Sequence, residues 1–127
     1  MVSSIKIERI DIAKQKIVVI DDNELLANSL VLFLEGIGDI SVDTYCSPEQ
    51  FLQQKENLYD IETKFIIDNN CNSKMTGIAL AERLASKGFT KLYLLSGTEF
   101  EASEVPSYLT VLLKGNIDEL EKVILAH

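Results

Sequence analysis

Five short apolar segments recur along the chain, and their spacing constrains the fold more than any other feature of the sequence. They occupy residues 16–20, 39–45, 64–67, 91–95 and 109–113. The first, Lys16 to Ile20, is rich in β-branched residues, as expected of a strand buried on both faces. Segments with the period of an amphipathic helix lie between most of these strands. Alternating strands and helices predict a parallel sheet with helices on both of its faces.

The first helix is predicted from its cap and its apolar face. Asn23 is a suitable N-cap, because its side-chain oxygen can accept a hydrogen bond from an amide at the open end of the helix. Four apolar side chains then fall on one face: Leu26, Leu30, Phe33 and Leu34. Gly36 or Gly38 is expected to end the helix.

Similar signals mark the later helices. Ser, Pro and Gln within residues 47–50 predict the start of a second helix, which fades near Leu58. A third helix is expected over residues 76–87, and a capping box at residues 116–119 begins the last one. The fourth helix, between the last two strands, is poorly marked and is cut by Pro106, so we expect it to be shortened.

The length of the chain fits one domain. It has 127 residues, of which 46% are apolar, enough to bury a core at this size. The repeating pattern is confined to residues 16–127, which we predict to form the domain. Residues 1–15 are predicted to be an N-terminal arm or linker.

Charge and residue usage exclude several classes of function. The formal net charge of −8 argues against direct binding of nucleic acid, because an acidic surface repels the phosphate backbone. Cys46 and Cys71 lack the spacing of a zinc site. His127 is the only histidine, which argues against a Ser-His-Asp triad and an internal phosphohistidine. Without a secretory signal or a membrane-length apolar run, a cytoplasmic protein with reduced thiols and no membrane partner is expected.

Polar side chains follow four of the predicted strands. Asp21 and Asp22 follow the first strand, Asp68 the third, Ser96 the fourth and Lys114 the fifth. Ligands of parallel sheets bind beyond the carboxyl ends of the strands, so these groups should converge on one edge. Taken one at a time, each has an ordinary structural explanation as a helix cap, a turn residue or a solvated lysine. Their joint placement favours a functional site.

The chemistry of these groups suits phosphoryl transfer. Three carboxylates that lie close together repel one another, and a hard divalent cation such as Mg²⁺ relieves the repulsion. The cation and Lys114 would neutralise an incoming phosphoryl group, while the Ser96 hydroxyl could donate a hydrogen bond to it. A carboxylate held in line could then attack phosphorus and form an acyl phosphate.

The same segments resemble the response-regulator receiver domain over about residues 16–126. The similarity lies in Ile17 to Asp22, in Phe65 to Asp68 followed by Gly77, in Leu94 to Gly97 and in Leu112 to Lys114. Each fragment is weak alone, but the set in this order is specific. The resemblance implies an α/β fold, a flavodoxin-like (βα)5 three-layer sandwich with a five-stranded parallel sheet in the order 2-1-3-4-5.

The resemblance also implies roles for the residues at the strand ends. Asp68 would be the phosphoacceptor, and Ser96 and Lys114 would hold the phosphoryl group. Four residues would bind Mg²⁺: Asp22 as the main carboxylate, Asp21 through water, Asp68, and Asn70 through its carbonyl. A histidine kinase or phosphotransfer protein would supply the phosphoryl group, and the sequence leaves a homodimer open. Such a domain assists its own phosphorylation and dephosphorylation but turns over no outside substrate.

The sequence departs from the family pattern in three places. Gly115 follows Lys114, where the family usually has a proline after a cis peptide bond. Val111 stands where the family usually has Tyr or Phe as a switch. The loop from Asp68 to Gly77 is one residue longer than usual and lacks the usual proline.

Three other interpretations stay open. A pseudo-receiver, a binding module that keeps the fold without phosphorylation, is favoured by the missing proline and aromatic residue. A haloacid-dehalogenase-type phosphatase would need a second acid two residues after its nucleophile, where this chain has Asn70. A nucleotide-binding flavodoxin-like domain would need a Gly- or Ser/Thr-rich phosphate loop, where this chain has Asp21 to Glu24.

Overall fold

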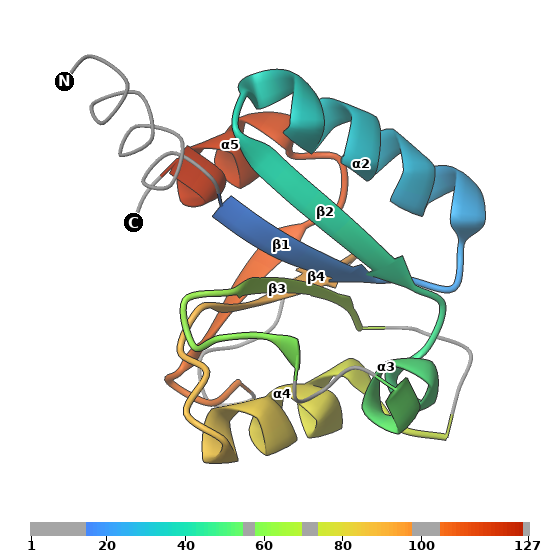
Figure 1. Cartoon of the computed structure of the whole chain (residues 1–127), viewed down its shortest axis with the longest axis vertical. Coiled ribbons are helices and arrows are strands. Elements are labelled where there is room, and N and C mark those ends of the chain that lie inside the picture. Colours follow the sequence, from blue (N-terminus) through green and yellow to red (C-terminus); the bar gives the residue numbers. More distant parts are fainter. Residues whose placement is uncertain (1–14, 55–57, 70–73, 98–104, 126–127) are drawn as a thin grey trace, which may run out of the picture.

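The computed structural model describes residues 15–54, 58–69, 74–97 and 105–125. Within these ranges, strands and helices follow one another in nearly regular alternation (Figure 1). In chain order they are β1 (Gln15–Ile20), α2 (Glu24–Ile37), β2 (Ile40–Tyr45), α3 (Pro48–Gln54), β3 (Lys64–Asp68), α4 (Gly77–Ser86), β4 (Leu92–Ser96), β5 (Leu109–Leu113) and α5 (Ile117–Leu125).

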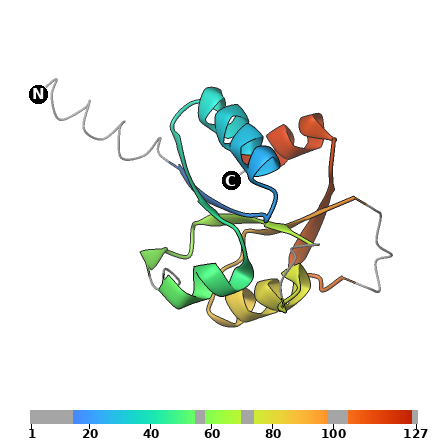
Figure 2. The ribbon, with the colours of Figure 1, turned by 90° about the vertical axis from the view of Figure 1, so that its right-hand side faces the viewer.

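The strands form one parallel sheet in the order β2-β1-β3-β4-β5. Helices α2 and α5 cover one face of the sheet, and α3 and α4 cover the other (Figures 1 and 2). The predicted flavodoxin-like three-layer fold and its strand order are therefore confirmed. The strand order reverses at β1 and β3, so their carboxyl ends lie where folds of this class bind ligands.

Aromatic rings fill the face under α3 and α4. We call five of them the aromatic cluster: Tyr45, Phe51, Tyr59, Phe65 and Phe89. The Phe65 ring lies at the centre, 5.6 Å from Phe51 and 5.0 Å from Phe89, with both contacts edge to face. At the β2 end, the Tyr59 hydroxyl donates to Asp43 Oδ2 at 2.6 Å. This face of the sheet is therefore held by interlocking rings, which prefer such edge-to-face arrangements.

Aliphatic side chains fill the face under α2 and α5. The buried ones are Ile17, Val19, Ala27, Leu34, Ile66, Leu95, Leu112 and Leu120. The strands serve both faces by alternation, so that Phe65 and Ile67 of β3 point toward the aromatic side and Ile66 toward the aliphatic side. Burial on both faces explains why the strands are continuous apolar runs in the sequence.

The predicted helix caps are confirmed. The side-chain oxygens of Asn23, Ser47 and Asn116 each accept a hydrogen bond from the main-chain amide three residues later. The Gln50 side chain also reaches back and accepts a bond from the Cys46 amide at 2.7 Å. These bonds satisfy amides at the open ends of α2, α3 and α5, which explains why the helices begin where they do.

One expectation about the helices was wrong. Leu26, expected on the buried face of the first helix, is 45% exposed, because α2 meets the sheet through Ala27 and Leu34. The third helix, expected from about residue 76, begins at Gly77, and Thr76 is its N-cap and accepts a hydrogen bond from the Ala79 amide. No described helix has both the length and the apolar composition needed to cross a membrane.

Some expectations concern residues outside the described ranges. The shortened fourth helix would fall mainly on residues 98–104, which are not described, while residues 105–108 before β5 contain no helix. Asn70 and Cys71 also lie outside the described residues. The division into an arm over residues 1–15 and a domain over residues 16–127 stays a prediction, since only Gln15 of that arm is described.

Candidate functional site

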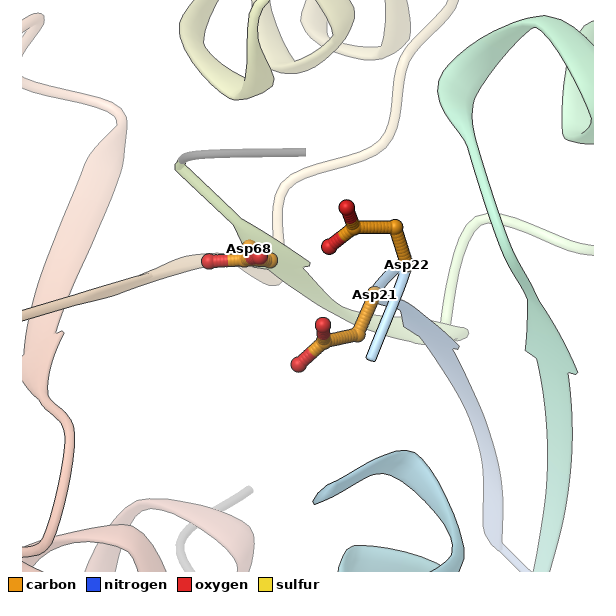
Figure 3. Close-up of side chains that lie close together, drawn as sticks. All are labelled: Asp21, Asp22 and Asp68. Atoms are coloured by element: carbon orange, nitrogen blue, oxygen red, sulfur yellow. The ribbon is translucent and has the colours of Figure 1, made fainter. Parts of the chain in front are cut away.

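Three carboxyl groups lie together at the carboxyl ends of β1 and β3. Ile20 of β1 is paired with Ile67 of β3, so the residues that follow them, Asp21 and Asp68, are neighbours across the sheet. Asp22 comes next in the chain, and one carboxylate oxygen of each of the three lies within 4.8 Å of the others. Figure 3 shows Asp21 and Asp22 beside the end of the strand that carries Asp68.

The two innermost carboxyl groups are almost completely buried. Asp21 and Asp68 are each 3% exposed, whereas Asp22 is exposed to solvent. Burial raises the pKa of Asp21, and the nearby Asp68 carboxylate raises it further, although a hydrogen bond from the Asn23 amide lowers it. Asp21 is therefore harder to ionise than an aspartate in water.

One oxygen of Asp21 gives an independent sign that the site suits a cation. The Asn23 amide donates to Asp21 Oδ1 at 2.9 Å, but Oδ2 is buried without a hydrogen-bond partner among the described residues. A buried polar atom that lacks a partner costs free energy. Oxygen ligands that include carboxylates are those that Mg²⁺ prefers, so Asp21, Asp22 and Asp68 fit a bound divalent cation.

Lys114 brings a positive charge to the same place. Its Nζ lies 2.9 Å from Asp68 Oδ1, and this hydrogen bond raises the pKa of Lys114. The Lys114 amide donates to the Ser96 carbonyl at 2.7 Å, which ties the end of β5 to the end of β4. Asp68 is therefore placed between a second carboxylate and an ammonium group.

The residue after the lysine gives this turn its own geometry. Gly115 has a φ of +90°, which glycine adopts easily, whereas the ring of proline fixes φ near about −65°. Lys114 thus reaches Asp68 from a glycine turn, without the proline that the receiver family usually has there. Val111, at the position of the family's aromatic switch, is partly buried and packs on the aromatic side of the core.

Ser96 ends β4 and is buried. Asp68 is paired with Leu95, so Ser96 stands one residue beyond Asp68 on the neighbouring strand. The structure thus brings the five described candidates to one edge of the sheet: Asp21, Asp22, Asp68, Ser96 and Lys114. Asn70, the remaining candidate, lies outside the described residues.

Gly77 contributes to the site in a way that the sequence did not reveal. A Cβ atom added to Gly77 would lie 2.8 Å from the main-chain oxygen of Asp68 and 3.1 Å from Cα of Asn69. Only glycine therefore lets the start of α4 approach the end of β3 this closely. The signal in the sequence was a glycine at the first position of a helix, directly after the Thr76 cap.

Comparison with known proteins supports the fold. No family model matches the chain, and no curated protein matches it. A crystal structure of FixJ-N superposes with a TM-score of 0.66 at 18% identity, covering 90% of this chain and 96% of that chain. A response regulator receiver protein from Pseudoalteromonas atlantica gives a TM-score of 0.65 at 18% identity, covering 86% of this chain and 96% of that chain. This chain has the receiver fold.

The receiver fold explains why residues far apart in the sequence meet at one edge. Each candidate comes from the carboxyl end of a different strand or from the turn after it, and parallel strands bring these ends together. The result combines a buried carboxylate, two further aspartates whose oxygens could hold a cation, and a lysine. Such a set can accept a group that carries concentrated negative charge.

Proposed function

We propose that this chain is a phosphoacceptor receiver of two-component signal transduction. Asp68 takes a phosphoryl group from a histidine kinase or a phosphotransfer protein, and the domain then changes conformation. The single observation that carries the proposal is the placement of Asp68. Asp68 is buried, and its Oδ1 lies 2.9 Å from Lys114 Nζ. One of its carboxylate oxygens also lies within 4.8 Å of carboxylate oxygens of Asp21 and Asp22, close enough for the three to bind one cation.

Each residue of the site has its own role in the phosphoryl transfer. A carboxylate oxygen of Asp68 attacks phosphorus and forms a P–O bond, while the P–N bond of the donor phosphohistidine breaks and its nitrogen keeps the electron pair. Lys114 moves from Asp68 to a phosphoryl oxygen, and the Ser96 hydroxyl donates to another. Mg²⁺, held by Asp21, Asp22, Asp68 and the Asn70 carbonyl, would neutralise charge on the phosphoryl oxygens when bound.

This role makes the domain a switch rather than an enzyme with an outside substrate. It assists its own phosphorylation and the slow hydrolysis of its aspartyl phosphate, and it works in the cytoplasm, where histidine kinases present their phosphoryl groups. The net charge of −8 suits a basic partner surface and opposes direct contact with nucleic acid.

Intact mass after incubation with Mg²⁺ and acetyl phosphate tests the proposal. The wild-type chain should gain one phosphoryl group, and Asp68→Ala should gain none, because the nucleophile is gone. Asp39→Ala is the matched control, since Asp39 is an exposed aspartate at the opposite end of the sheet, and it should be modified like the wild type. Modification of Asp68→Ala to the wild-type extent would contradict the assignment of Asp68.

A pseudo-receiver is the second candidate, and two observations favour it. Val111 replaces the aromatic switch, and Gly115 adopts a conformation that excludes the usual proline. On this hypothesis the domain binds a protein partner constitutively. Failure of the wild-type chain both to gain a phosphoryl group and to bind Mg²⁺ would favour this second candidate over the first.

A further inference from the structure

A polar pocket opens beside β2, on the face of the sheet that α3 and α4 cover. β2 is an edge strand (Figure 1), and α3 follows it after a short turn. α3 has seven residues and is about 10 Å long, whereas the six residues of β2 span about 20 Å. The helix is therefore too short to cover the whole strand, which leaves room for a pocket of about 270 Å³. We call it the β2 pocket, and its lining includes Lys16, Asp43, Tyr45, Leu58, Tyr59 and Asp60.

Two of the polar side chains in this pocket stand on a sheet face that is largely apolar. Ile40 and Val42 of β2 pack on the aliphatic side, so the alternation of the strand turns Asp43 to the opposite face. Lys16 of β1 lies on that face too, because its Nζ contacts Asp43. The other side chains of β1 and β3 on this face are Val18, Ile20, Phe65 and Ile67. The polar pair therefore gives the pocket a floor that suits a polar ligand.

The hydrogen bonds between the tyrosines of the pocket run toward Asp43. The Tyr59 hydroxyl donates to Asp43 Oδ2 at 2.6 Å. A hydroxyl carries a single hydrogen, so the Tyr45 hydroxyl, 2.8 Å from that of Tyr59, is the donor in their contact. Burial, followed by the contacts with Asp43 and Tyr45, raises the pKa of Tyr59, which keeps its hydrogen in place. The oxygen of Tyr45 is left with the capacity to accept.

The charges of the pocket favour a cation. Among the described residues, Lys16 is the only cation that lines it, and Lys16 Nζ lies 3.0 Å from Asp43 Oδ1 and 3.1 Å from Ser41 Oγ. Asp60 adds a second carboxylate, which is exposed and accepts a hydrogen bond from the Glu62 amide. The pocket therefore holds two carboxylates and one ammonium group. Since the side chains of Lys16 and Asp43 are 36% and 40% exposed, their ion pair is weak and leaves Asp43 accessible.

We propose that the β2 pocket binds a guanidinium group on an alkyl stem, such as the side chain of arginine. A guanidinium has several N–H donors and no acceptor, which matches the carboxylates of Asp43 and Asp60 and the accepting oxygen of Tyr45. It is planar and weakly hydrated, and such a group packs readily against aromatic rings. The alkyl stem can contact Leu58, which lines the pocket and is 69% exposed. The proposal does not depend on phosphorylation of Asp68, because it rests on other side chains.

The same groups argue against an anion and against an apolar ligand. An anion would meet the carboxylates of Asp43 and Asp60, and most of the hydrogen-bonding capacity of Lys16 Nζ is already used by its two partners. An apolar ligand would cover carboxylates and a hydroxyl without replacing their hydrogen bonds to water, which costs free energy. A guanidinium group satisfies these acceptors.

Titration with butylguanidinium tests the proposal. The probe is added to the full chain, and binding is followed by the NMR shifts of the main-chain amides. We expect saturable shifts concentrated in the residues of the β2 pocket. Asp43→Asn should weaken binding about tenfold, because a charge-assisted hydrogen bond is lost. Asp60→Asn, at a more exposed carboxylate, should weaken it about threefold. Butylurea, which has nearly the same shape but no charge, should not bind.

A variant of the resident lysine tests the sign of the charge that the pocket accepts. Lys16→Met removes the cation that shares Asp43, and should strengthen binding of butylguanidinium about threefold. Asp118→Asn is the matched control, since Asp118 is an exposed aspartate of α5, on the other side of the sheet, and it should leave the affinity unchanged. Equal losses in Asp60→Asn and Asp118→Asn would show only a general attraction to an acidic surface and would overturn the proposal. Binding of butyrate that Lys16→Met abolishes would overturn it as well.

A peptide probe separates an arginine of a protein partner from a free guanidinium compound. Ile61 is 57% exposed and lies in the same connection as Leu58, so the neighbours of an arginine could contact both. If acetyl-Leu-Arg-Leu-amide binds at least about fivefold more tightly than butylguanidinium, and Leu58→Ser/Ile61→Ser removes this gain, the arginine of a protein partner is the ligand. Equal affinities would assign the pocket to a free compound. In both cases the peptide with citrulline in place of arginine should not bind. Equal binding of the citrulline peptide would overturn the assignment to a guanidinium group.

Discussion

One short strand, β3, contributes to two regions of opposite character. At one position Phe65 lies at the centre of the aromatic cluster, where its ring packs edge to face against Phe51 and Phe89 and the Tyr59 hydroxyl is hydrogen-bonded. At its end Asp68 lies in the carboxylate site, where buried charges crowd together and one oxygen of Asp21 has no described partner. Both regions are buried, and both belong to the same sheet.

The contrast between these two regions shows that the aromatic cluster stabilises the fold, whereas the carboxylate site is kept in spite of its cost in stability. Burying aromatic rings removes apolar surface from water and is favourable. Burying carboxylates without full compensation is unfavourable, and a domain keeps such groups where they bind or react. Substitutions in the two regions should therefore change stability in opposite directions, which can be measured.

Phe65→Ala should give the largest change in the free energy of unfolding. Phe65 is fully buried and touches rings on both sides, so its loss leaves a cavity as well as removing apolar burial. We expect a loss of about 3–5 kcal/mol in the free energy of unfolding, measured by urea denaturation. Phe33→Ala, which removes a partly buried phenylalanine of α2 from the opposite face of the sheet, should cost less than half as much. Equal losses would show that the aromatic cluster is no better packed than the opposite face.

Tyr59→Phe, also in the aromatic cluster, should give a smaller loss in the free energy of unfolding. The ring remains, but the hydroxyl that donates to Asp43 Oδ2 and lies 2.8 Å from the Tyr45 hydroxyl is removed. A hydrogen bond to a charged, partly exposed group contributes about 1–2 kcal/mol, and thermal or urea unfolding can resolve a change of this size. Tyr108→Phe, at an exposed tyrosine, is the control and should have little effect. No change in Tyr59→Phe would show that packing alone holds the cluster.

The sequence was sufficient to predict the sheet and the edge at which the polar residues meet. Strands that are buried on both faces are continuous apolar runs, and each polar residue that ends such a run lies at the carboxyl edge. That logic predicts that Asp21, Asp68 and Lys114 lie together at this edge. It also explains why short motifs at strand ends indicated the receiver fold although identity to the solved receivers is only 18%.

Features set by distances between elements could not be predicted in this way. Helical periodicity placed Leu26 on the buried face, but where a helix rests on a sheet depends on the packing of its neighbours, and Leu26 borders a groove instead. The close approach of Gly77 to Asp68 is a contact between the start of α4 and the end of β3, which are separated by eight residues in the sequence. The hydrogen bond between Tyr59 and Asp43 joins residues that no local pattern relates.

Asp21→Asn should give the smallest change in the free energy of unfolding. This change should be an increase, opposite in sign to the losses expected in the aromatic cluster. In metal-free buffer at neutral pH, we expect a gain on the order of 1 kcal/mol in the free energy of unfolding. Burial and the Asp68 carboxylate raise the pKa of Asp21 in the native state above its ordinary value of 3.8. The native protein therefore holds this proton more tightly than the unfolded chain does. The contribution of Asp21 to the stability of the wild type should consequently fall as the pH rises from about 3.8 through the native pKa of this residue.

The asparagine variant cannot lose this proton, so its advantage over the wild type should grow across the same pH window and disappear below it. Asp39→Asn removes an equal charge at an exposed site, and so controls for the lower net charge of the variant. A ligand that binds only the native state stabilises it. Added Mg²⁺ should therefore stabilise the wild type more than Asp21→Asn, which lacks one of the proposed carboxylate ligands, and should reduce the difference between their free energies of unfolding. A variant that is less stable than the wild type at neutral pH without Mg²⁺ would show that Asp21 is adequately paired. The carboxylate site would then contribute to stability as the aromatic cluster does, and the contrast between the two ends of β3 would be lost.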